Sequence, residues 1–127
     1  MIPSFRAWDG GSLCHMYSPS EVMVGDSCIW ILNEDSWEDE WIVNNDLVLM
    51  QSTELTDKNG KEIFEGDVVK MAKNVYSEPT YYEVVRHRGG AYRLESKQYG
   101  CELWLRHTDC EIAGNIYENP ELLEVRT

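Results

Sequence analysis

The stretch from Leu49 to Val69 constrains the fold more than any other, because two tight-turn sequences separate its short apolar segments. In the first turn, Asp57 comes first and Gly60 comes last, and these residue types are preferred at the ends of a type I turn. Gly60 can adopt the left-handed conformation that closes a hairpin with a bulge. We therefore expect Asp57, Asn59 and Gly60 to be structural turn residues.

A second turn follows within the same stretch. Gly66 frees the backbone immediately before Asp67 and the apolar strand sequence that follows. Ile63 and Phe64 lie between the two turns and are expected in the core. The pattern predicts that Gly66 and Asp67 also serve the backbone, so that one strand pair folds back on another.

Strand patterns dominate the rest of the chain. Residues 102–106 predict a strand with Leu103 and Leu105 on one face. One helical turn is expected at 18–21, and another begins at Asn119 and Pro120, which suit an N-cap and a first helical position. Three hairpins are predicted: 21–24 with 28–32 around Gly25-Asp26, 41–43 with 47–50 around 44–46, and 81–87 with 91–95 around Gly89-Gly90.

The predicted fold class is all-β, a small single domain over residues 1–127. It consists of twisted antiparallel hairpins, is partly barrel-like, and ends in a short helical turn. A chain of 127 residues suits one domain. No apolar run approaches the roughly 20 residues that span a bilayer, and no secretion signal is visible, so the expected compartment is the cytoplasm.

The charge balance restricts the partners of the chain. The formal net charge is −12, which argues against direct binding to nucleic acid and against an anionic membrane surface. The same charge permits a basic protein partner, because complementary fields speed encounter. Four cysteines are present without a C-x-x-C pair, so the sequence predicts neither a zinc knuckle nor a redox motif, and no cofactor is expected.

An acidic segment with two tryptophans interrupts the strand patterns. An aromatic pair ringed by acids resembles an interface hot spot with a polar rim, which makes this segment the candidate partner-binding surface. A solvated loop and a divalent-metal site are the alternatives, although EF-hand spacing is absent and no Lys or His lies within the segment. The candidate residues are Glu34, Asp35, Trp37, Glu38, Asp39, Glu40 and Trp41.

Three blocks of sequence together resemble the YopX family of phage and prophage proteins. They are Phe5–Asp9, the stretch Leu49–Val69, and Ile112–Leu122. The resemblance implies a mainly β fold and an association with Gram-positive bacteria and their phages, which makes the bacterial host cell the expected setting, and it implies no established biochemical activity. It supplies no catalytic residue. Two positions depart from the family pattern, with Ser52 in place of an aromatic residue and Glu54 in place of a small residue, usually Gly. Glu54 is unfavourable if that position needs a positive φ.

These observations favour a phage or prophage accessory protein without catalytic activity, which acts by contact with an unidentified protein partner. Self-association into a homo-oligomer is part of this hypothesis. Two alternatives from other classes are open. The acidic surface could imitate nucleic acid and inhibit a host DNA-binding protein, or the acidic segment could serve a metal-dependent hydrolase.

Overall fold

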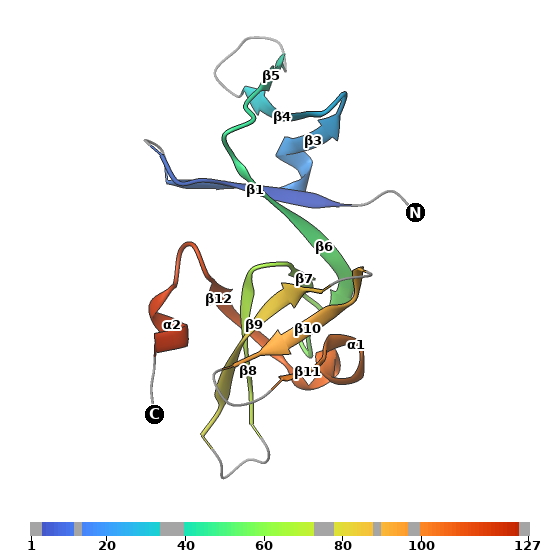
Figure 1. The fold of residues 1–127 in the computed structure, drawn as a ribbon, viewed down its shortest axis with the longest axis vertical. Coiled ribbons are helices and arrows are strands. Elements are labelled where there is room, and N and C mark those ends of the chain that lie inside the picture. The colour runs from blue at the N-terminus through green and yellow to red at the C-terminus, as the bar shows by residue number, and fades with distance from the viewer. Residues whose placement is uncertain are drawn as a thin grey trace. The chain divides into compact units, whose positions relative to one another are not determined.

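The computed structural model of the chain describes residues 4–11, 14–33, 40–72, 78–87, 90–96 and 100–124. Antiparallel strands dominate, with short helical turns between them (Figure 1). The prediction of a mainly β, partly barrel-like fold with a C-terminal helical turn is confirmed. The strands are β1 Phe5–Asp9, β2 His15–Tyr17, β3 Val22–Gly25, β4 Cys28–Asn33, β5 Glu40–Val43, β6 Val48–Thr56, β7 Glu62–Phe64, β8 Asp67–Met71, β9 Thr80–Arg86, β10 Tyr92–Glu95, β11 Gly100–Glu102 and β12 Glu111–Asn115. The helical turns are η1 Pro19–Glu21, α1 Leu103–Arg106, η3 His107–Asp109 and α2 Glu121–Glu124.

The chain divides into two compact units, Met1–Ser52 and Thr53–Thr127. Strand β6 contributes residues to both. Its first part pairs with β1 in unit 1, whereas Thr53 Oγ1 donates a hydrogen bond of 2.7 Å to the Ile63 carbonyl of β7 in unit 2. The prediction of a single domain over residues 1–127 stays a prediction.

Unit 1 contains the strands β2-β1-β6 of one antiparallel sheet and a separate sheet in the order β3-β4-β5. Ala7 of β1 is fully buried and lies opposite Tyr17 on one side and Leu49 on the other. Val22 and Ile31 are paired in the second sheet and are also buried. The core therefore draws on one face of each sheet, and consists of Ala7, Tyr17, Val22, Ile31 and Leu47 with Phe5, Ile29 and Leu49 packed against them.

The hairpin β3–β4 forms as predicted, but its turn lies one residue later. Gly25 still pairs with Cys28, so the two loop residues are Asp26 and Ser27. Their φ values are +51° and +61°. Positive φ at both central positions defines a type I′ turn, whose twist matches that of the flanking strands. The prediction that Gly25 and Asp26 form the turn is therefore wrong by one position.

The predicted hairpin between residues 41–43 and 47–50 is wrong. β5 pairs with β4, and β6 pairs with β1. The residues between them are tied to β4, because the Asn44 amide donates to the Ile29 carbonyl (2.8 Å) and the Ile29 amide donates to Asn45 Oδ1 (2.8 Å). The linking segment therefore leads the chain from one sheet into the other.

Unit 2 is built on a five-stranded sheet in the order β11-β10-β9-β8-β12. The predicted hairpin β9–β10 is confirmed, and the His87 amide closes its loop on the Ala91 carbonyl (2.8 Å). The register of β12 on β8 shifts between Ile112 and Gly114. The C-terminal turn α2 lies against β9. The core comprises Ile63, Val69, Met71, Tyr82, Val84, Leu94, Leu103 and Cys110.

The predicted strand over residues 102–106 is wrong. Residues from Leu103 to Arg106 form the helical turn α1, and η3 continues from it. Leu103 is fully buried, whereas Trp104 is 63% and Leu105 is 57% exposed. In a helix, positions two apart lie about 200° apart around the axis, so Leu103 and Leu105 do not share a face.

Glu54 adopts a φ of +65° within β6, although most non-glycine residues avoid this region. It is the position at which the family pattern has a small residue, so the sequence departure coincides with an unfavourable backbone conformation. A Cβ atom in the left-handed region costs about 1–2 kcal/mol.

We expect Glu54→Gly to raise the free energy of unfolding by about 1 kcal/mol relative to Glu54→Ala, because only Gly lacks the Cβ atom that opposes a positive φ. The alanine variant is the matched control, since it removes the same carboxylate. Urea unfolding of both variants measures the difference. Equal stability of the two variants would show that this backbone conformation is not strained.

Candidate protein-binding surface

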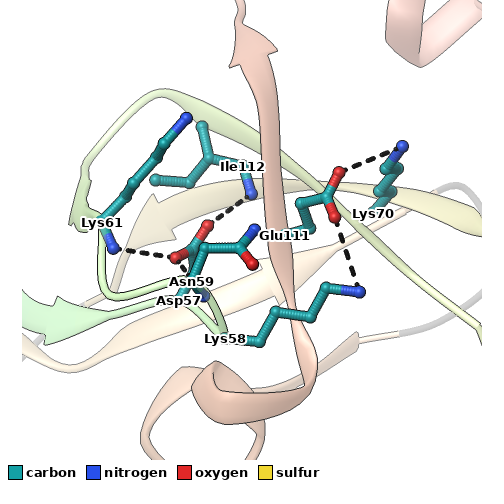
Figure 2. A network of polar contacts seen from close by, with 7 residues as sticks. All are labelled: Asp57, Lys58, Asn59, Lys61, Lys70, Glu111 and Ile112. Atoms are coloured by element: carbon teal, nitrogen blue, oxygen red, sulfur yellow. Dashed lines mark hydrogen bonds and ion pairs between the residues drawn. The ribbon is translucent and has the colours of Figure 1, made fainter.

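The first predicted turn is built around the carboxylate of Asp57, which is only 3% exposed (Figure 2). Its Oδ1 accepts hydrogen bonds from the amides of Asn59 and Lys61, each at 2.9 Å. Its Oδ2 accepts from the amide of Ile112 in β12 at 3.0 Å. One side chain therefore closes its own turn and fixes a strand 55 residues further along the chain.

Backbone hydrogen bonds complete this turn. The Gly60 amide donates to the Asp57 carbonyl (3.0 Å), the bond expected of a type I turn. Gly60 has a φ of +81°, and the Asp57 amide donates to the Lys61 carbonyl (2.8 Å). The Lys58 amide reaches the Cys110 carbonyl (2.9 Å), which joins the turn to the residue before β12.

The electrostatic state of Asp57 follows from these contacts. Burial alone raises the pKa of the carboxyl group, but the amides of Ile112, Lys61 and Asn59, with the charge of Lys61, outweigh it. The net effect lowers the pKa of Asp57 below its ordinary value of 3.8. The carboxylate is held ionised by backbone donors on both oxygens, which suits a structural anchor.

An exposed ion-pair group borders the same strand. Glu111 of β12 lies 3.5 Å from Lys58 Nζ and 3.2 Å from Lys70 Nζ (Figure 2). The hydrogen bond from Lys70, with its charge, lowers the pKa of Glu111. All three side chains are at least one-third exposed, so solvent screens these pairs and they add little to stability.

The second predicted turn serves the backbone as well. Asp67 is buried, and its Oδ2 accepts from the Phe64 amide at 2.8 Å. Gly66 has a φ of +88°, donates to the Val84 carbonyl and accepts from the Ile116 amide, both at 2.9 Å. This glycine therefore joins three segments of unit 2.

The described residues contain no group of three or more His, Cys, Asp or Glu side chains placed to hold a metal ion. His107 Nδ1 is 2.7 Å from the Thr56 carbonyl oxygen. Cys110 donates through Sγ to the Arg106 carbonyl (3.2 Å), and burial is the main reason that the pKa of its thiol rises to about 11. Such a thiol is a poor nucleophile at neutral pH.

Most of the predicted partner-binding segment lies outside the described residues, namely Glu34, Asp35, Trp37, Glu38 and Asp39. Glu40 and Trp41 are described, and they begin β5. Glu40 is exposed and Trp41 is half-buried. The assignment of these seven residues to a partner-binding surface stays a prediction.

The register of β3-β4-β5 places Trp41 on an apolar sheet face. Trp30 of β4 lies opposite Met23 on one side and Val43 on the other. Leu32, two residues from Trp30, lies opposite Trp41. Directly opposed residues, and residues two apart on a strand, share a face. We call the set Met23, Trp30, Leu32, Trp41 and Val43 the apolar sheet face.

This face points away from the core of unit 1. The opposite face of the sheet carries Val22 and Ile31, which are buried in that core. On the apolar sheet face, Met23 is 46% and Val43 is 45% exposed. The Trp30 indole N–H donates to the Gly25 carbonyl (3.2 Å), so its polar atom is satisfied. An antiparallel sheet with one buried face usually presents polar side chains outward, and this one does not.

Sequence reasoning identified Trp41 but missed Met23, Trp30, Leu32 and Val43. A signal was present, because the three strands read as continuous apolar runs and do not alternate with polar residues. Such runs are typical of strands that are covered on both faces. The sequence could not indicate which of the two faces the rest of the chain would leave uncovered.

The fold and this surface define a small antiparallel β protein with turn-anchored sheets and an apolar sheet face open to solvent. The chain belongs to the YopX protein family, whose model matches residues 4–124. A comparison with curated proteins gives no significant match.

Two solved structures are similar over almost the whole chain. Protein EF1440 from Enterococcus faecalis has 30% sequence identity and a TM-score of 0.64, with 97% of this chain and 99% of that chain covered. Protein yopX from Bacillus subtilis has 22% identity and a TM-score of 0.67, with the same coverage, and supports the fold. No helix among the described residues has the length and apolar character needed to cross a membrane.

We expect Asp57→Asn to lower the free energy of unfolding at pH 7 by about 2 kcal/mol, because the amide NH₂ group cannot accept a hydrogen bond from a backbone N–H. The folded-state pKa of Asp57 is lowered, so its stabilisation is present above pH 3.8 and disappears as pH falls through the folded-state pKa. The gap between wild type and variant should therefore narrow in acid. Urea unfolding from neutral pH to about pH 2.5 measures it.

Asp109→Asn provides the control, because Asp109 is an exposed partner of Arg106. That substitution should leave the free energy of unfolding almost unchanged at every pH. A constant gap between Asp57→Asn and wild type across the acid range would contradict the assigned role of the carboxylate charge.

Proposed function

We propose that this protein is a phage or prophage accessory protein that acts without catalysis, by binding a protein partner on the apolar sheet face. The observation that carries the proposal is the outward exposure of Met23 and Val43 on either side of Trp30. Contiguous apolar surface of this kind on a small protein marks interaction sites. Membership of the YopX family supports the phage origin.

The composition of the face suits an interface core. Tryptophan is enriched among residues that dominate binding energy, and methionine adapts to irregular partner surfaces. Completing the burial of Met23 and Val43 contributes about 1 kcal/mol each, since each side chain is about half exposed when free. Burial of Trp30 by a partner leaves no unsatisfied donor at the indole N–H, because the Gly25 carbonyl already accepts a hydrogen bond from it.

We propose the acidic segment as the rim of this interface. Trp41 belongs to the face, and Glu40 precedes it on the same strand. A polar rim around an apolar centre is the usual anatomy of a protein interface. We therefore keep Glu34, Asp35, Trp37, Glu38 and Asp39 as proposed contact residues.

The alternative functions find less support. The hydrolase hypothesis has no assembled metal-ligand group among the described residues. A nucleic-acid mimic would present carboxylates in place of the apolar residues on its contact face. Self-association is a form of protein binding that the same face permits, and the experiment below separates it from capture of another protein.

The test places a photo-crosslinking amino acid, p-benzoylphenylalanine, at position 43 or, as the matched control, at position 105. Val43 and Leu105 are both exposed apolar positions, but they belong to different units. Irradiation in bacterial cells that express the protein should give a specific covalent adduct from position 43 and none from position 105. Mass spectrometry identifies the captured chain.

A captured heterologous chain identifies the partner, and an adduct of twice the chain mass identifies self-association. Absence of any adduct at position 43, in a protein whose circular dichroism spectrum is unchanged, would refute binding through this face. Equal adducts from positions 43 and 105 would show that capture is unspecific and would refute it as well.

A further inference from the structure

Unit 1 carries most of the negative charge of the chain. In residues 1–52, Arg6 is the single basic side chain against nine acidic ones, which gives a net charge of −8 of the total −12. Residues 53–127 hold ten basic and fourteen acidic side chains, a net charge of −4. Unit 1, which presents the apolar sheet face, therefore has a larger excess of negative charge than unit 2. Its acids are Asp9, Glu21, Asp26, Glu34, Asp35, Glu38, Asp39, Glu40 and Asp46.

Two of these acids are described on the sheet that carries the apolar sheet face. Asp26 lies in the β3–β4 turn, Glu40 begins β5, and both are exposed. Arg6 lies on β1, in the other sheet, where its Nε donates to Met50 Sδ (3.4 Å). The described strands β3, β4 and β5 contain no basic residue.

We infer that the partner segment on the apolar sheet face is a basic, amphipathic stretch of another protein, with apolar side chains over Trp30 and Val43 and Lys or Arg side chains toward the exposed carboxylates of Asp26 and Glu40. The inference rests on the proposed function. Charge complementarity selects this occupant. A second copy would bring one unit of net charge −8 against another of net charge −8. A neutral partner would leave the carboxylates of Asp26 and Glu40 desolvated without a counter-charge.

The sheet also suits an extended segment. In the part of the chain that the structure describes, β5 pairs on one side only, with β4. A strand added to β5 would place every second side chain on the face that carries Trp41 and Val43. The intervening side chains would lie on the same side as Glu40, where a basic residue finds an opposite charge. A sequence that alternates apolar and basic residues meets both requirements.

Three synthetic peptides of equal length test the inference: alternating Leu-Lys, alternating Leu-Glu and alternating Ser-Lys. Isothermal titration calorimetry of the full chain should give the tightest binding for Leu-Lys. The Ser-Lys peptide should bind about tenfold more weakly, because it lacks the apolar anchor. The Leu-Glu peptide should not bind.

Two variants and a control locate the site. Met23→Gln with Val43→Thr should weaken Leu-Lys binding about tenfold, which corresponds to two half-exposed apolar side chains. Asp26→Asn with Glu40→Gln should weaken it and reduce its dependence on salt. Trp104→Gln with Leu105→Gln replaces exposed apolar residues of unit 2 and should leave the affinity for the Leu-Lys peptide unchanged.

The outcomes separate this inference from the proposed function. If Leu-Glu binds as well as Leu-Lys and both depend on Met23 and Val43, the face is a docking site but its partner is not basic. If Ser-Lys binds as well as Leu-Lys and Met23→Gln with Val43→Thr does not weaken its binding, the binding is unspecific charge attraction and the inference is wrong. Failure of Leu-Lys to bind also overturns it, while the crosslinking experiment still decides the proposed function.

Discussion

Unit 2 depends on one buried carboxylate that satisfies backbone donors from two distant segments. A charged side chain out of contact with water must be paired, and Asp57 is paired with amides of its own turn and of β12. The turn therefore reaches its lowest energy only when β12 is in place. Ile112, whose amide donates to Asp57, also borders the register shift of β12 on β8. The Leu49–Val69 stretch therefore contributes, through Asp57, to the docking of β12.

The proposed binding surface lies in the other unit and consists of apolar side chains on one sheet face. One face of its sheet contributes Val22 and Ile31 to the core, and the other face is apolar and partly exposed. The turns of the Leu49–Val69 stretch anchor the backbone of unit 2, and the proposed binding residues stand outside that stretch.

Local sequence patterns predicted the elements whose partners are adjacent in the chain. The hairpins β3–β4 and β9–β10 and the turns at Gly60 and Gly66 are of this kind. The segments 41–43 and 47–50 also resemble a hairpin, but β6 pairs with β1, some forty residues earlier, and local pattern contains no such information. Residues 103–106 were misassigned because a single helical turn is too short to show a helical period.

Both outer strands of the β3-β4-β5 sheet, β3 and β5, carry apolar residues on their two faces. Open, apolar strand edges are templates for irregular stacking of identical molecules. The net charge of −12 keeps copies of the protein dispersed through mutual repulsion. This colloidal protection depends on pH, and it vanishes near the sequence pI of about 4.5, where the mean charge is zero. Acidification would therefore favour precipitation through these outer strands.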